Sequence, residues 1–294
     1  MKRKHRALIT AVLSLTAVLA AWPVRGAAQD VEIGALLGWN FPGLDTTYTH
    51  SFVPQFTAFK PYTGSGGQTI HVQGISGMGL GAYFNVAMRD HLLLQFSYTP
   101  FSSDIQGYSS DYTVSVNYST SKPPDTPPQQ FNYTYTSDGW QAIGGTMKDK
   151  AYSMSLIYRL GTSETIAADL IAGLTYFHFS GSTQAMGFTR FWLDEVGQLH
   201  SEDYSLWLDF GPKDTWGGNV GAALNIHFNS NFGLVFQGRY FLAVPVKATI
   251  GFRMISLEGL NETVIYPNKE RIDKNEFKVN ASFLSLQGGF KVMF

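Results

Sequence analysis

The sequence has 294 residues and contains no cysteine. Charged residues make up only 15% of it, and aromatic residues also make up 15%, whereas an ordinary soluble domain is about 25% charged. Without cysteine, the chain cannot form a disulfide framework, a cysteine-based zinc finger, an iron–sulfur site or a thiol nucleophile. The formal net charge of −1 offers no basic surface for nucleic acid, so no nucleic-acid partner is expected.

The first 28 residues are predicted to be a secretory signal peptide. Four basic residues stand within the first six positions, an apolar run covers 7–21, and small residues occupy 26–28. This order is typical of a signal peptide, and the apolar run is too short for a spanning helix of about 20 residues. We expect cleavage near Ala28, which leaves 29–294 as one mature domain. A membrane anchor at this end is the alternative.

Eight segments of the mature chain alternate apolar and polar residues with the period of two that is typical of β-strands. One face of each segment is apolar and almost free of charge, and the other is rich in Gly, Ser, Asn and Gln. Such segments suit tilted strands that cross a bilayer, which need about 9–11 residues. In chain order the segments are 31–41, 72–86, 92–99, 151–160, 168–176, 216–228, 232–242 and 284–294.

The links between these segments alternate in length. Short links near 89–90, 161–165 and 229–231 alternate with long ones, which cover roughly 42–71, 102–149, 177–215 and 243–282. Short turns on one side and long loops on the other are typical of outer-membrane barrels. Because lipid cannot satisfy an open sheet edge, the sheet has to close. We therefore predict an all-β fold, a transmembrane up-and-down antiparallel β-barrel of about eight strands with long extracellular loops and periplasmic termini.

Two of the long links carry strand patterns of their own. Segments 111–118 and 131–136 alternate around a proline-rich stretch, which predicts a hairpin above the membrane. In residues 246–256 the apolar residues stand at even-numbered positions, as they do in the seventh segment. We interpret these residues as that strand continuing past the lipid. A ten-stranded barrel is the alternative interpretation.

The last residues resemble the C-terminal targeting strand of bacterial outer-membrane proteins, which ends in phenylalanine after apolar residues at alternate positions. The residues that match are Leu286, Phe290, Val292 and Phe294. Segment 77–94 also resembles the hairpins of small barrels of the OmpA and OmpX type. This resemblance implies a bacterial outer-membrane location, contact with outer-membrane lipids, and assembly by periplasmic chaperones and the barrel-assembly machinery. The resemblance does not extend to a peptidoglycan-binding domain, so we do not expect attachment to peptidoglycan.

Five charged residues fall on the lumen face of the predicted strands. Since the first and last strands of a closed meander are neighbours, Glu32 and Lys291 should lie close together. Arg159 and Asp169 flank one short turn and face the same way, so they form a second expected pair, and Arg239 sits higher. A charge inside a barrel needs a partner or water. We interpret the set as a structural network, with an ion gate or selectivity ring as the alternative.

Candidate chemistry is sparse. His178 and Ser180 share one strand face, as in the His-x-Ser pair of lipid A deacylases, but that family's neighbouring asparagine is missing here. The link 177–215 also carries acidic residues and a histidine that a barrel protease of the omptin type would need, without an omptin motif; these are Asp194, Glu195, His200, Glu202 and Asp203. Their spacing fits no EF-hand. The sequence therefore predicts no catalytic, cofactor-binding or metal-binding residues.

The expected function is that of a non-enzymatic outer-membrane protein with a structural or surface-interaction role. Its long outward loops are rich in Tyr, Thr and Asn, side chains that adapt to many binding partners, so adhesion or binding of an extracellular ligand is expected there. A narrow pore for small solutes is the first alternative. A hydrolase at the outer leaflet is the second.

Overall fold

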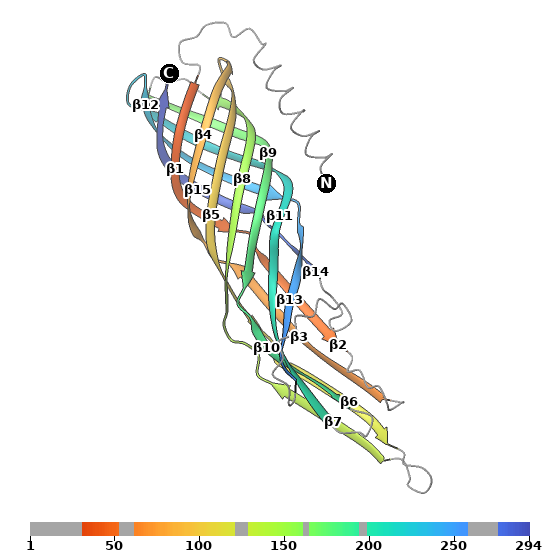
Figure 1. The fold of residues 1–294 in the computed structure, drawn as a ribbon. Helices are drawn as coiled ribbons and strands as arrows, with labels where there is room; N and C mark the ends of the chain where they lie inside the picture. The colour runs from red at the N-terminus through yellow and green to blue at the C-terminus, as the bar shows by residue number, and fades with distance from the viewer. Residues whose placement is uncertain (1–30, 53–61, 121–128, 161–164, 194–198, 258–275) are drawn as a thin grey trace.

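A computed structural model describes residues 31–52, 62–120, 129–160, 165–193, 199–257 and 276–294. The predicted signal peptide, the acidic pair Asp194 and Glu195 and the proline-rich tip of the hairpin lie outside these ranges. The described residues form one antiparallel sheet of fifteen strands (Figure 1). Among them, no helix is both long and apolar enough to cross a membrane.

Eight of the strands close into a ring. Each strand pairs with the next one around the ring, and the last pairs with the first through the register Glu32↔Met293 to Pro42↔Phe283. The order around the ring follows the order in the chain, so the predicted eight-stranded up-and-down barrel is confirmed and the ten-stranded alternative is wrong. The ring consists of β1 (Val31–Pro42), β4 (Gly77–Arg89), β5 (Leu92–Ser109), β8 (Ile143–Leu160), β9 (Ile166–Thr183), β11 (Leu199–His227), β12 (Phe232–Ala243) and β15 (Phe283–Met293).

The outside of the ring is apolar. Large hydrophobic side chains that point outward remain about half exposed or more, as in Leu80 at 66% and Phe290 at 71%. Water would not favour so continuous an apolar surface, whereas the hydrocarbon of a bilayer does. This lipid-facing belt includes Ile33, Leu37, Trp39, Met78, Leu80, Phe96, Leu156, Leu170, Leu174, Val220, Leu224, Phe236, Leu286 and Phe290.

Aromatic residues mark the edge of the belt that faces the long loops, and we call the direction toward these loops upward. Four of them stand side by side on consecutive strands β5, β8, β9 and β11, with ring centroids 4.9, 6.3 and 5.2 Å apart. Tyr and Trp concentrate where hydrocarbon meets headgroups, so residues beyond this row lie outside the membrane-spanning part of their strands. We call the row formed by Tyr98, Tyr152, Tyr176 and Trp216 the aromatic row.

The wall continues beyond the aromatic row, where Figure 1 shows a long sheet extension at the end away from the C-terminus. The parts of β5, β8, β9 and β11 that lie beyond the aromatic row carry this extension, and further strands pair with them. β6 and β7 form the predicted hairpin through the register Tyr112↔Ser137 to Thr120↔Gln129. The added strands are β2 (Asp45–Phe52), β3 (Tyr62–Gly74), β6 (Tyr112–Thr120), β7 (Gln129–Ser137), β10 (Met186–Leu193), β13 (Val246–Leu257) and β14 (Glu276–Val279).

An apolar core fills the base of this extension. Ring contacts tie it together: Phe101, Phe177 and Phe241 each lie within 6.4 Å of Phe283, centroid to centroid. β14 also contacts β2, where the Tyr48 and Phe277 rings are 5.7 Å apart. The extension is therefore held to the barrel by hydrophobic burial as well as by strand pairing.

Two expected segments differ in detail. The expected segment 72–86 is interrupted after Gly74, so Val72 belongs to β3 and pairs with Gly107 of the extension. The sequence pattern hides this break because Val72 and Met78 are an even number of residues apart, so the alternation of apolar and polar residues continues across it. Residues 246–256 do continue past the lipid, since β12 and β13 run along the same partner β11, but a break at Val244 and Pro245 divides them into two strands.

Candidate functional site

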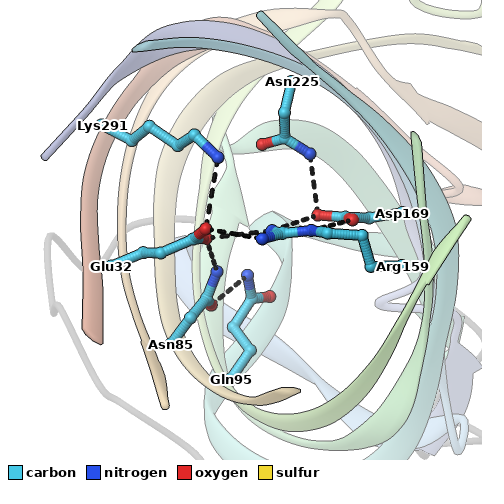
Figure 2. Close-up of polar contacts among 7 residues, drawn as sticks. All are labelled: Glu32, Asn85, Gln95, Arg159, Asp169, Asn225 and Lys291. Atoms are coloured by element: carbon cyan, nitrogen blue, oxygen red, sulfur yellow. Dashed lines mark hydrogen bonds and ion pairs between the residues drawn. The ribbon is translucent and has the colours of Figure 1, made fainter. Parts of the chain in front are cut away.

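The lumen holds an ionic cluster near the end with the short turns. Arg159 donates from Nε and Nη2 to Asp169 at 2.9 and 3.1 Å, and from Nη1 and Nη2 to Glu32 at 2.9 and 3.2 Å. Lys291 Nζ lies 3.3 Å from the same Glu32 carboxylate, and Asn225 donates to Asp169 at 2.8 Å. Figure 2 shows Arg159 reaching across the lumen toward Glu32. The structure thus brings together four of the five charged residues named from the sequence, and Arg159 joins the two expected pairs.

The fifth charged residue, Arg239, crosses the lumen from the opposite side. It is only 1% exposed. Its Nη1 donates to Gln95 at 2.8 Å and to Ser97 at 3.1 Å, while its Nη2 donates to Ser155 at 3.0 Å and to Asn219 at 2.6 Å. β12 and β5, which carry Arg239 and Gln95, lie four places apart in the ring of eight strands. The guanidinium therefore spans the barrel and has no acidic partner among the described residues.

A continuous series of hydrogen bonds connects the two arginine sites. Asn85 donates to Glu32 at 2.8 Å, and Gln95 donates to Asn85 at 3.0 Å (Figure 2). The Gln95 side-chain oxygen in turn accepts from Arg239. On the far side, Asn219 donates to Thr175 at 2.9 Å, and the Thr175 hydroxyl lies 2.9 Å from that of Ser153. Every strand of the ring contributes one residue to this lumen network, which we define as Lys291, Glu32, Asn85, Gln95, Arg239, Asn219, Thr175 and Ser153.

The lumen network explains how a narrow barrel tolerates buried charge. An eight-stranded barrel is just wide enough for side chains to fill it, and burying a charge is costly unless it is compensated. Arg159 is compensated by two carboxylates, whereas Arg239 is compensated by four hydrogen bonds to neutral groups. The polar members of the network were missed from the sequence. Their signal was present as amides and hydroxyls on the lumen face, but which of them meet depends on the stagger between strands.

The outer surface carries a second cluster, directly above the aromatic row. His178 Nδ1 lies 2.8 Å from an Asp214 oxygen on the neighbouring strand. Ser180 follows two positions along β9 on the same face, but no hydrogen bond joins it to His178 within the described ranges. The structure therefore supplies an acidic partner for His178 and leaves the serine outside the pair. Sequence reasoning missed Asp214 because 36 residues separate it from His178.

The remaining members of the set that an omptin-type protease would need lie on a strand rather than in a loop, as far as the structure describes them. His200, Glu202 and Asp203 belong to β11, where they pair with residues of β10. No group of three or more His, Asp or Glu in the described part of the chain could hold a metal ion.

One buried acid stands apart from both clusters. Asp149 lies on β8 three residues beyond Tyr152, in the extracellular part of the strand, and is only 1% exposed. Neither carboxylate oxygen has a side-chain hydrogen-bond partner among the described residues, and the backbone N–H of Lys150 offsets only part of the effect of burial. Its neighbours in register are Phe101 and Phe179 of the apolar core. Burial raises the pKa of Asp149 to about 8, because an apolar environment disfavours the charged form.

The C-terminal strand faces the lipid with the side chains that resemble a targeting signal. Leu286, Phe290 and Phe294 are 48%, 71% and 66% exposed, and β15 pairs with both β1 and β12. This strand closes the barrel. Its role in targeting stays a prediction.

No protein-family model and no curated protein matches the sequence. Among solved structures, the chain is similar to the outer-membrane protein OprG from Pseudomonas aeruginosa, with 14% identity, a TM-score of 0.45, and coverage of 91% of this chain and 96% of that one. It is also similar to Ail of Yersinia pestis, at 10% identity, TM-score 0.32 and coverage of 89% and 99%. A third similar structure is the outer-membrane protease OmpT from Escherichia coli, with 11% identity, a TM-score of 0.34, and coverage of 92% of this chain and 99% of that one.

OprG and OmpT are outer-membrane proteins, and OmpT is a protease. The assignment of this chain as a bacterial outer-membrane β-barrel rests on its own closed ring, its apolar exterior and its polar lumen.

Proposed function

We propose that this protein is a non-enzymatic, non-conducting surface protein whose extracellular sheet extension binds a partner outside the cell. The observation that carries the proposal is the combination of a lumen crossed by side chains from every ring strand with a paired, folded extension beyond the lipid. A barrel built in this way serves as an anchor. As for outer-membrane barrels in general, lipid surrounds it, and we expect the barrel-assembly machinery to insert it.

The β6–β7 hairpin is the part best placed for contact with a partner. Its strands pair over nine positions, and β6 also pairs with β3, which fixes the hairpin to the extension. One face presents small hydroxyl side chains to solvent, and Ser115 and Thr134 lie 3.4 Å apart across the two strands. The exposed or half-exposed members of this hydroxyl face are Thr113, Ser115, Thr134 and Thr136. Such side chains can exchange water for hydrogen bonds with a ligand at little cost.

The test is a substitution that charges the hydroxyl face without removing the strands. Cells displaying Thr113→Glu/Thr136→Glu should lose attachment to epithelial monolayers, to matrix-coated wells or to arrayed glycans relative to the wild type. Thr47→Glu/Thr49→Glu, which places the same two charges on β2, is the matched control and should bind normally. If the hairpin variant attached as well as the wild type on all three surfaces, or if wild-type cells attached no better than cells lacking the protein, the proposal would be wrong.

In the narrow-pore alternative, small solutes would have to pass through the lumen. This passage would require the contacts of Arg159 and Arg239 to open, which means separating hydrogen-bonded buried charges at a cost of several kcal/mol. The intact lumen network supports the non-conducting proposal instead.

A hydrolase at the outer leaflet is a second candidate, favoured by the His178–Asp214 contact of 2.8 Å. An acid that orients a histidine beside a serine is the arrangement needed for nucleophilic catalysis. Expression of the wild type would then release acyl chains from lipid A, and Ser180→Ala would abolish that release. The non-enzymatic proposal expects no release from either protein, measured by mass spectrometry of extracted lipid A.

A further inference from the structure

The outer wall above and below the aromatic row is ordered by chemistry. Strand pairing places Lys150 beside His178 and His178 beside Asp214, one level above the aromatic row on β8, β9 and β11. The level directly below the row carries apolar side chains, including Met154 and Leu174. The wall thus changes from apolar to aromatic to ionic within a few residues. This is the order that a lipid presents, from acyl chain to headgroup.

The ionic level carries two exposed lysines that form no ion pair of their own within the described ranges. Lys148 and Lys150 point outward from β8 and are exposed, and neither has an ion-pair partner among the described residues. Asp214 is engaged by His178. Asp104, on the adjoining strand β5, lies in register with Thr146, one level above Lys148. Two ammonium groups on one strand therefore face the headgroup region and can bind an anion there.

Two adjoining hollows accompany these charges. A shallow recess of about 450 Å³ is lined by Lys150, Tyr152, Tyr176 and His178. The recess is open on its outer side, so a phosphate and the group that carries it can lie against these four residues. Below it, an apolar groove of about 330 Å³ runs over β8 and β9 and the neighbouring β4 and β5. It is lined mainly by aliphatic residues, namely Met88, Leu94, Met154, Ser155, Leu156, Ala172, Gly173 and Leu174.

We propose that this part of the wall is a binding site for a phosphorylated lipid of the outer leaflet. The phosphate is held by Lys148 and Lys150, the sugar or glycerol lies over Tyr152 and Tyr176, and one acyl chain occupies the groove below. Ammonium–phosphate contacts are charge-assisted hydrogen bonds, and the apolar groove supplies burial that a free phosphate cannot use. The site is separate from the hydroxyl face of the β6–β7 hairpin and does not depend on chemistry at Ser180.

The probe is bisphosphorylated lipid A, titrated against the refolded full-length barrel in zwitterionic phosphatidylcholine nanodiscs and detected by native mass spectrometry. Each lysine near a membrane surface contributes about a fivefold effect on binding, so Lys148→Gln/Lys150→Gln should weaken binding roughly thirtyfold. The matched control, Lys247→Gln/Lys278→Gln, removes two exposed lysines of the extension and should bind like the wild type. Lipid A without phosphates should bind weakly to every variant, and millimolar inorganic phosphate should not displace the bound lipid.

Three results would overturn the proposal. The first is equal lipid A affinity of the wild type and the Lys148→Gln/Lys150→Gln variant. The second is equal binding of lipid A with and without its phosphates. The third is displacement by inorganic phosphate, which would make this a site for the free anion. Heat-modifiable gel migration verifies that each variant is folded, and if the double variant does not fold, the single variants with their fivefold effects replace it.

Discussion

Replacing Arg159 by alanine tests whether the ionic cluster of the lumen stabilises the barrel. Arg159 makes four hydrogen bonds to two carboxylates whose side chains are only 4% and 5% exposed. In the variant, Glu32 keeps Lys291 and Asn85, whereas Asp169 keeps only Asn225. Removing one partner of a buried ion pair costs about 3–5 kcal/mol because a charge stays buried without compensation. We expect Arg159→Ala to lower the free energy of unfolding by that amount.

The assay is equilibrium unfolding by urea of the barrel refolded in phosphatidylcholine vesicles, followed by tryptophan fluorescence and heat-modifiable gel migration. Arg89→Ala is the matched control, because Arg89 is exposed next to a turn and should change stability by no more than about 0.5 kcal/mol. The double variant Arg159→Met/Asp169→Asn removes one charge of each sign and keeps the Glu32–Lys291 pair, so it should recover most of the loss. A loss below about 1 kcal/mol for Arg159→Ala would refute the reasoning, since it would mean that the two carboxylates find solvent.

Three further predictions concern stability. Asp149→Asn should stabilise the barrel at pH 8 and flatten its pH dependence. The folded-state pKa of Asp149, near 8, lies above the ordinary 3.8, so this group stabilises the wild type most in acid, and its contribution falls by about 1.4 kcal/mol per pH unit between these values. Equal urea midpoints for both proteins at pH 5 and pH 8 would contradict this. Leu37→Lys, at a side chain 50% exposed, should cost about 2–4 kcal/mol in vesicles because it faces lipid, and a neutral effect would argue for a water-facing surface. Gly34→Val should cost about 1–3 kcal/mol, since a side chain there would collide with the Tyr83 ring; unchanged unfolding would show that the ring moves freely.

The membrane-spanning strands could be predicted because the lipid outside and the narrow lumen inside impose alternation on every one of them. Glu32 and Lys291 could be paired for the same reason, since closure makes β1 and β15 neighbours. Arg159 and Asp169 followed from the short turn between their strands. These inferences need only the order of the strands.

The remaining features depend on geometry that strand order does not provide. Gln95 and Arg239 are 144 residues apart and meet only because the ring has eight strands with a particular stagger. The extension was less visible because its strands pair outside the lipid, where no alternation of apolar residues against a bilayer is required. Val72 is an example: it fits the alternation of apolar residues in β4, although it belongs to β3.

The most direct test of the account is the conductance of the refolded wild-type protein in planar lipid bilayers. The lumen network joins residues of all eight ring strands through hydrogen bonds of 2.6 to 3.3 Å. The account therefore predicts a baseline without steady open-channel current at neutral pH. Steady and large open-channel currents from the wild-type barrel would contradict it, because ions could then pass a lumen that these side chains are inferred to close.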